Sequence, residues 1–121
     1  LLDYGDRRRL SLAARLQLLV SVCQGVHHAH QKGVIHRDLK PSNVLVVEID
    51  GRPVPKIIDF GIAAATHGAA AATAVGGAAE PRCLGTPGYL SPEQAALDDA
   101  RIDVRSDVYA LGVLLFESST G

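Results

Sequence analysis

Residues 36–43 read HRDLKPSN, and this short stretch decides what the rest of the chain has to build. It gathers five strongly polar side chains, which are His36, Arg37, Asp38, Lys40 and Asn43. Pro41 lacks a backbone N–H, and both this proline and the residue before it disfavour helical geometry. We therefore predict an ordered loop that presents polar groups, which is the kind of segment that often carries a functional site.

The composition describes a globular domain or part of one. The chain has 121 residues, a net charge of -1 and 47% hydrophobic residues, which excludes a disordered tail. Basic residues are scattered apart from the run Arg7, Arg8 and Arg9. A run this short is more typical of a solvated helix entry than of an arm that binds nucleic acid. We expect no nucleic-acid partner.

Cysteine usage and hydropathy indicate where the chain would reside. Cys23 and Cys83 are far apart and form no CxxC pair, so neither a zinc site nor a disulfide framework is indicated. A reducing cytoplasm fits best. The apolar run around residues 111–116 is far shorter than the roughly 18 residues of a membrane span, and no signal peptide opens the chain. We expect a cytoplasmic segment without membrane contact.

A long helix is predicted between Ser11 and Gly33. Ser11 can cap its start and Gly33 can end it. Apolar and histidine side chains recur at steps of three and four, the pattern of a helix with one buried face. The members of this expected face are Leu12, Leu16, Leu19, Val20, Cys23, Val26, His27 and His30.

Three further segments have distinct patterns. The β-branched runs 44–47 and 54–58 flank Asp50-Gly51, a strong turn pair, and predict a small β-hairpin. Residues 63–80 contain ten alanines interrupted by glycines, which favours a mobile loop. After Asp107 the sequence VYALGVLLF is apolar nearly all round and predicts a helix buried in a core.

Four motifs occur in one order: HRDLKPSN at 36–43, DFG at 59–61, GTPGYLSPEQ at 85–94 and SDVYALGVLLFE at 106–117. Together they resemble the C-terminal lobe of protein kinases. The flanking text, LLDYGDRRRLSLAARL and DGRPVPKIIDFG, is most similar to bacterial serine/threonine kinases of planctomycete type. The resemblance implies an α+β, kinase-like fold. Residues 1–121 would form part of its mainly helical C-lobe, with a small β-hairpin and an activation segment at 59–93.

The resemblance also assigns chemistry to the polar loop. Phosphoryl transfer requires mainly the positioning of two oxygens and the neutralisation of charge on the moving phosphate. Asp38 would accept or orient the proton of a serine or threonine hydroxyl on a protein substrate. Lys40 would face the transferring phosphate, and a lysine here resembles the serine/threonine branch of the family. Asn43 and Asp59 offer hard oxygen donors for Mg2+ bridging the phosphates of ATP.

Other residues acquire supporting roles by the same resemblance. Leu45 would lie under the adenine ring, and His36 and Phe60 would stack beneath the site. Asp107 would hold the catalytic loop through backbone hydrogen bonds. The activation segment would involve Arg37, which in the family pairs with a phosphorylated loop. Thr86 would contact the catalytic aspartate and the substrate, and Glu93 would receive an arginine from a later helix.

Several conspicuous residues have plainer explanations. His27, His28 and His30 resemble a metal cluster, but we expect His27 and His30 to pack on the buried helix face. Gly5, Gly33 and Gly51 are expected to be ordinary turn residues. Asp103 and Arg105 form either a surface ion pair or a structural anchor, and the sequence favours neither.

Two interpretations remain open from the sequence. The chain has no methionine, no GxGxxG motif and only three lysines, Lys32, Lys40 and Lys56. We therefore expect a fragment without the N-terminal lobe and without the helices that follow in the family. It would be either the catalytic core of a kinase that is active only in a longer polypeptide, or a non-catalytic, pseudokinase-like binding module. The oligomeric state cannot be predicted from these residues.

Overall fold

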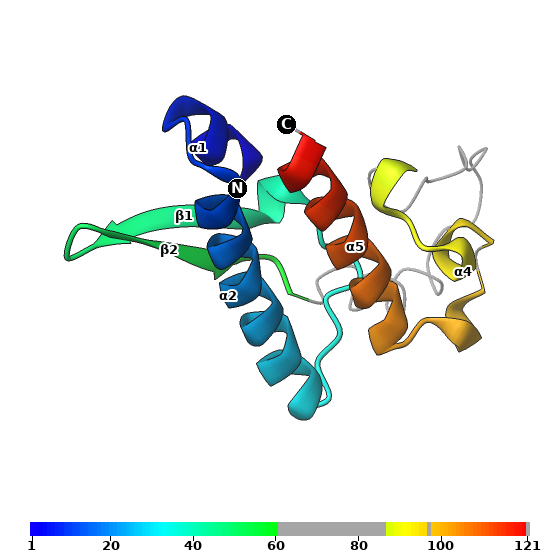
Figure 1. The fold of residues 1–121 in the computed structure, drawn as a ribbon. Coiled ribbons are helices and arrows are strands. Elements are labelled where there is room, and N and C mark those ends of the chain that lie inside the picture. Colours follow the sequence, from blue (N-terminus) through cyan, green and yellow to red (C-terminus); the bar gives the residue numbers. More distant parts are fainter. Residues whose placement is uncertain (61–86, 97, 121) are drawn as a thin grey trace, which may run out of the picture.

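The structure is a computed structural model that describes residues 1–60, 87–96 and 98–120 (Figure 1). Its helices are α1 (Leu2–Arg7), α2 (Leu12–Gln31), α4 (Pro92–Ala95) and α5 (Val104–Thr120), and its strands are β1 (Val44–Ile49) and β2 (Arg52–Ile57). Short 3-10 turns lie at Pro41–Asn43, Pro87–Tyr89 and Asp99–Arg101. This mainly helical arrangement with one hairpin confirms the expected fold class. The alanine-rich stretch 63–80, Cys83 and Thr86 lie outside the described residues.

Helix α2 has the predicted ends. Ser11 is its N-cap and accepts a hydrogen bond at Oγ from the backbone N–H of Ala14, at 3.3 Å. Gly33 follows the last turn with a φ of +73°, a left-handed conformation that glycine adopts without steric cost. The predicted helix is confirmed.

The buried face of α2 differs from the predicted one. Its buried side chains are Leu18, Leu19, Val22 and Val26. Four predicted members, Leu12, Val20, Cys23 and His27, are exposed. The helix is apolar on more than one face, and β2 and α5 cover only the face that carries Val22 and Val26. The prediction was wrong at these positions because periodicity cannot identify which of two apolar faces has a neighbour.

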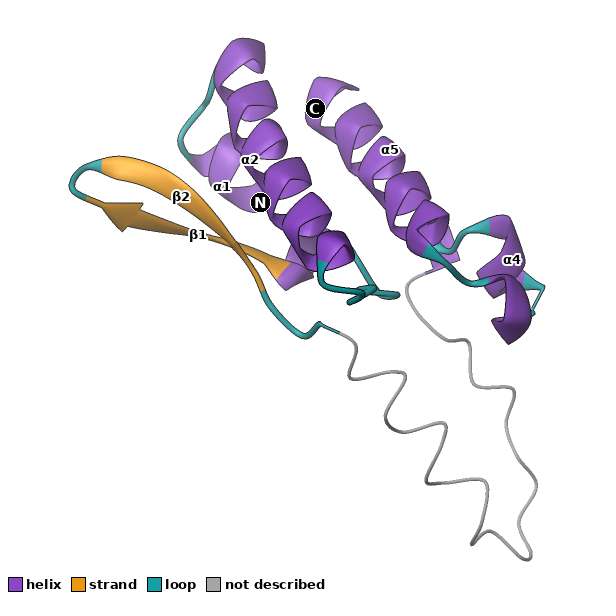
Figure 2. Cartoon of the chain, turned by 90° about the horizontal axis from the view of Figure 1, so that it is seen from below, coloured by secondary structure: helices purple, strands orange, loops and turns teal. Residues whose placement is uncertain are grey.

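The hairpin forms as predicted, around Asp50-Gly51. Ile49 pairs with Arg52 in an antiparallel register, so Asp50 and Gly51, which lie between them, make the turn. Both have positive φ angles, 50° and 72°, which is the backbone of the hairpin turn that matches strand twist. At the other end the backbone N–H of Ile58 donates to the carbonyl of Asn43, at 3.0 Å. The hairpin base therefore holds the polar loop beside residues 58 and 59, while its tip projects away from the helices (Figure 2).

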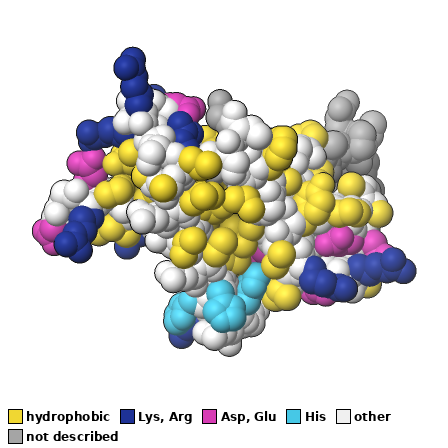
Figure 3. Space-filling view, viewed as in Figure 1, with side chains coloured by type: hydrophobic (Ala, Val, Ile, Leu, Met, Phe, Trp, Pro, Cys, Tyr) yellow, Lys and Arg dark blue, Asp and Glu magenta, His cyan; other side chains and the backbone are white. Residues whose placement is uncertain are grey.

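Helix α5 lies alongside α2 (Figures 1 and 2). Its buried residues share one face and are Ser106, Asp107, Ala110, Leu114 and Ser118. Other apolar side chains, which include Val108, Tyr109, Leu115 and Phe116, are exposed. Hydrophobic side chains accordingly spread over the middle of the molecular face in Figure 3. Within the described residues, the expectation of a helix buried all round was wrong, because α2 and the turn at Pro87–Tyr89 cover only part of the surface of α5.

Gly5 corrects a third expectation. It lies inside α1, not in a turn, and it is buried. A Cβ atom at this position would come within 3.1 Å of the guanidinium of Arg15, which also pairs with Asp6 at 2.7 Å. The small residue therefore lets Arg15 join α1 to α2. Arg7 and Arg8 are exposed, as predicted, and pair with Asp3 and Glu48 respectively.

Candidate active site

The polar loop is anchored by a buried carboxylate from α5. Asp107 is only 1% exposed and accepts the backbone N–H of His36 at Oδ2, at 2.8 Å, and that of Arg37 at Oδ1, at 2.9 Å. A buried carboxylate needs such donors, because an unpartnered buried charge is strongly destabilising. These are the backbone contacts that the family resemblance implied for Asp107.

His30 joins this anchor from the last turn of α2. Its Nε2 lies 2.7 Å from Asp107 Oδ2, across 77 positions of sequence. The helical pattern placed His30 on a buried face, but nothing in the spacing identified its polar partner. His27, in contrast, is exposed and contacts Gln31 at 3.1 Å. No metal-binding group of three or more side chains occurs among the described residues.

His36 connects the loop to the segment after β2. The side chain is fully buried, with Nε2 2.9 Å from the carbonyl of Ile58 and Nδ1 3.3 Å from the backbone N–H of Asp38. Because a carbonyl can only accept, Nε2 carries the proton and Nδ1 accepts. The ring lies 4.8 Å from that of Phe60, centroid to centroid, at a tilt of 54°. The predicted pair His36–Phe60 is thus brought together beneath the loop.

Asp38, Lys40 and Asn43 converge on one side of the loop. Lys40 Nζ lies 2.8 Å from Asp38 Oδ2, and Asn43 Nδ2 donates to the Asp38 carbonyl at 2.8 Å. The Asp38 side chain is 30% exposed and therefore accessible to a ligand. The arrangement combines an accessible carboxylate, which can accept a proton, with an ammonium that can neutralise a nearby anion.

Asp59 stands at the hairpin base, next to this group. It has a φ of 61° and is exposed, and it follows Ile58, which is hydrogen bonded to Asn43. Since Asn43 uses Nδ2 to hold Asp38, its Oδ1 is the atom able to bind a cation. An amide oxygen and an exposed carboxylate fit Mg2+, which prefers hard oxygen ligands. Leu45, on β1, exposes an apolar side chain beyond Asn43.

Gln94 is a loop contact that the sequence did not identify. Its side-chain Nε2 donates to the carbonyl of Arg37, 57 positions away. Arg37 has a φ of 68°, in the left-handed region that residues with a side chain seldom adopt. The motif containing Gln94 was recognised, but within it only Thr86 and Glu93 had been given roles.

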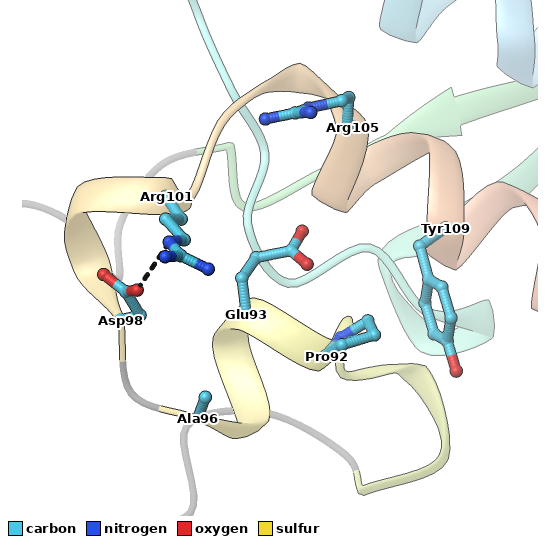
Figure 4. Close-up of a pocket in the computed structure, with 7 residues that line it drawn as sticks. All are labelled: Pro92, Glu93, Ala96, Asp98, Arg101, Arg105 and Tyr109. Atoms are coloured by element: carbon cyan, nitrogen blue, oxygen red, sulfur yellow. Dashed lines mark ion pairs between the residues drawn. The ribbon is translucent and has the colours of Figure 1, made fainter.

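Glu93 lies in a groove of about 680 Å³ beside α4 (Figure 4). Its carboxylate accepts a hydrogen bond from the hydroxyl of Ser106 at the start of α5. This hydroxyl, assisted by backbone hydrogen bonding, holds the pKa of Glu93 below its usual 4.5. Figure 4 shows Glu93 reaching into the groove, with Arg101 and Arg105 around it.

Arg105 resolves the alternative left open for Asp103. The two side chains form an exposed ion pair at 2.8 Å. Asp103 Oδ1 also accepts the backbone N–H of Arg105, at 2.8 Å, in the first turn of α5. The pair is therefore both a surface ion pair and a cap of the helix start.

Tyr89 ties the segment before α4 to α5. Its hydroxyl donates to the carboxylate of Glu117, and burial together with this carboxylate holds the pKa of Tyr89 above its usual range. The turn at Pro87–Tyr89 is thus fixed to the same helix that anchors the polar loop. Thr86, the predicted substrate contact, immediately precedes this turn but lies outside the described residues.

Comparison with known proteins identifies the family. The family model described as protein kinase domain matches residues 4–121. The serine/threonine-protein kinase PknB of Mycobacterium leprae is 41% identical over 106 residues, which cover 88% of this chain and 15% of that protein. Pkn1 of Myxococcus xanthus, a serine/threonine-protein kinase, is 38% identical over 113 residues, or 93% of this chain and 15% of that protein.

The chain therefore spans about 15% of the length of these curated relatives. Among the described residues, no helix combines the length and apolar character needed to cross a bilayer. The order of motifs, the anchored polar loop and the match over nearly the whole chain agree. The chain belongs to the protein kinase domain family.

Proposed function

We propose that the protein carrying this chain is a serine/threonine protein kinase that transfers the γ-phosphate of ATP to serine or threonine hydroxyls of a protein substrate. Residues 1–121 form part of its C-lobe, and residues 59–93 form its activation segment. The observation that carries the proposal is the convergence of Asp38, Lys40 and Asn43 on one loop with Asp59 at the adjoining hairpin base. Phosphoryl transfer depends mainly on positioning and charge neutralisation, which these groups can supply.

Each group in this convergence has one task. Asp38 orients the substrate hydroxyl and accepts its proton. Lys40, whose ammonium already lies at 2.8 Å from Asp38, neutralises charge on the phosphate that moves toward this carboxylate. Asn43 Oδ1 and the carboxylate of Asp59 would hold Mg2+, which would supply further charge neutralisation. Leu45 supports the adenine ring of ATP.

The remaining residues hold the polar loop in place or connect it to the activation segment. Asp107 fixes the loop backbone, and His36 with Phe60 supports it from below. Arg37 pairs with a phosphorylated activation segment, Thr86 contacts Asp38 and the substrate, and Glu93 receives an arginine. We place this segment in the cytoplasm of a planctomycete bacterium, on the strength of the flanking sequence and of two cysteines that are far apart in the chain. A membrane anchor of the full-length protein would lie outside this segment, and we propose neither nucleic acid nor membrane as a partner of the segment.

Substitution of two acidic residues tests the proposal. In a polypeptide that joins this chain to the rest of a kinase domain, Asp38→Asn and Asp59→Asn should each lower phosphate transfer by about 100-fold or more, because a base or a metal ligand is lost. Lys56→Ala is the control, since this side chain is exposed on β2 close to Asp59. Transfer from labelled ATP with Mg2+ to a generic basic protein is the measurement.

The outcomes separate the two interpretations of the sequence. An equal loss in all three variants would show that the site is misplaced. An unmodified protein that transfers no phosphate would favour the non-catalytic binding module.

A further inference from the structure

Gln94 connects the short helix α4 to the catalytic loop. The residue is only 9% exposed, and its Nε2 donates to the carbonyl of Arg37. Its Oε1 accepts two hydrogen bonds from Ser91, one from the backbone N–H and one from the hydroxyl, both at 3.1 Å. One side chain thus joins the start of α4 to a segment 57 positions away.

The partners fix which way the amide points. The Arg37 carbonyl can only accept, and the backbone N–H of Ser91 can only donate. A reversed amide would set oxygen against oxygen at Arg37 and N–H against N–H at Ser91. The amide oxygen therefore accepts hydrogen bonds from Ser91 at the start of α4, and the amide nitrogen donates one to the loop.

Arg37 needs such support because its backbone is in an unfavourable conformation. A φ of 68° is rare for a residue with a side chain, and such conformations persist where surrounding contacts determine them. Asp107 holds the N–H of Arg37 and Gln94 holds its carbonyl. The peptide groups on both sides of Arg37 are therefore fixed, and the second of them leads directly into Asp38.

We propose that Gln94 is a positioning residue for the reaction: it fixes the peptide group that enters Asp38 and links that peptide to the segment at residues 87–91. The inference rests on the proposed kinase function. The segment preceding α4 is itself attached to α5 through Tyr89 and Glu117. A displacement of this segment would therefore move the peptide group before Asp38, because the side-chain amide of Gln94 connects the two.

Gln94→Glu separates the two ends of the side chain. The variant keeps an oxygen for Ser91 but sets a carboxylate oxygen against the Arg37 carbonyl. In the polypeptide that contains the rest of the kinase domain, kcat should fall about tenfold with the KM for ATP within about twofold, because Asp38 is displaced while the nucleotide contacts remain. Gln24→Glu makes the same chemical change on the exposed surface of α2 and should have no effect.

A pH profile adds a readout that a purely structural role would not move. At low pH the introduced carboxyl group is protonated, and its O–H can donate to the Arg37 carbonyl as the amide did. The ratio of variant to wild-type kcat should therefore rise as the pH falls. The ionisable groups around this position, namely His36, Asp38, Glu93 and Asp107, are common to all the variants, so Gln24→Glu measured over the same pH range is the control.

Two further measurements keep the outcome decisive. Ser91→Ala weakens the start of α4 but leaves the contact of Gln94 with Arg37, so it should retain more activity than Gln94→Glu. Amide hydrogen exchange at residues 36–38 should be faster in Gln94→Glu than in Gln24→Glu, whether or not the protein transfers phosphate.

Specific results would overturn the inference. These are equal kcat values for Gln94→Glu and Gln24→Glu, a ratio independent of pH, an equal loss in Ser91→Ala, or unchanged exchange at residues 36–38. An inactive wild-type protein would instead remove the proposed kinase function, and the exchange comparison would still decide whether Gln94 holds the loop.

Discussion

At the scale of residues, the hydroxyl of Ser106 affects how the protonation of Glu93 depends on pH. The pKa of Glu93 is lowered mainly by the Ser106 hydroxyl. A carboxyl group whose pKa is lower in the folded state stabilises that state above its unfolded pKa, and this stabilisation is lost as the pH falls through the folded pKa. Ser106→Ala should therefore lower stability near neutral pH and reduce its decline below the usual pKa of 4.5.

Thermal melting between about pH 3 and pH 7, in the polypeptide that contains the rest of the kinase domain, measures this effect. Ser119→Ala is the matched control, because Ser119 lies on the exposed side of α5 and donates to the carbonyl of Leu115. If both variants show the same dependence on pH, Glu93 does not contribute in this way.

The residues of the site differ in how far the sequence could predict them. Asp38, Lys40, Asn43 and Asp59 stand in motifs that resemble those of protein kinases, and this resemblance is what implied their chemistry. His30 and Gln94 contact partners 77 and 57 positions away, and neither contact follows from local spacing. Only the packing of α2, α4 and α5 around the loop brings these side chains to it.

At the scale of elements, strand β2 packs against α2 at a glycine. A Cβ atom at Gly25 would lie 3.1 Å from Cδ1 of Ile57, on β2. Gly25→Val should destabilise the folded protein by about 1–3 kcal/mol, because overpacking displaces neighbours. Gln24→Val introduces the same side chain at the adjacent exposed position and should cost only a few tenths of a kcal/mol.

Denaturant unfolding of both variants, in the polypeptide that contains the rest of the kinase domain, checks this expectation. Equal midpoints would mean that β2 can move away from α2 without cost.

The helix α2 and the hairpin also show what the sequence could predict. The ends of α2 and the turn at Asp50-Gly51 follow from local backbone chemistry. The covered faces of α2 and α5 depend on their neighbours, so periodicity could not choose among several apolar faces.

At the scale of the whole molecule, exposed apolar surface should govern behaviour in solution. Phe116 is 67% exposed, and Val108, Tyr109 and Leu115 are also exposed on α5. Surface of this kind promotes association. Residues 1–121 alone should self-associate and lack a sharp cooperative melt, which sedimentation and calorimetry can measure. A soluble monomer with a sharp transition would contradict this prediction.

The anchoring of the polar loop by Asp107 also has a consequence for synthesis on the ribosome. Arg37 is made 70 residues before the carboxylate that holds its backbone. At a synthesis rate of about 5–20 residues per second, Asp107 is added roughly 4–14 seconds after Arg37. During this interval the left-handed backbone of Arg37 has no compensating contact from α5. The loop geometry that Asp107 holds can therefore form only after α5 has emerged and docked.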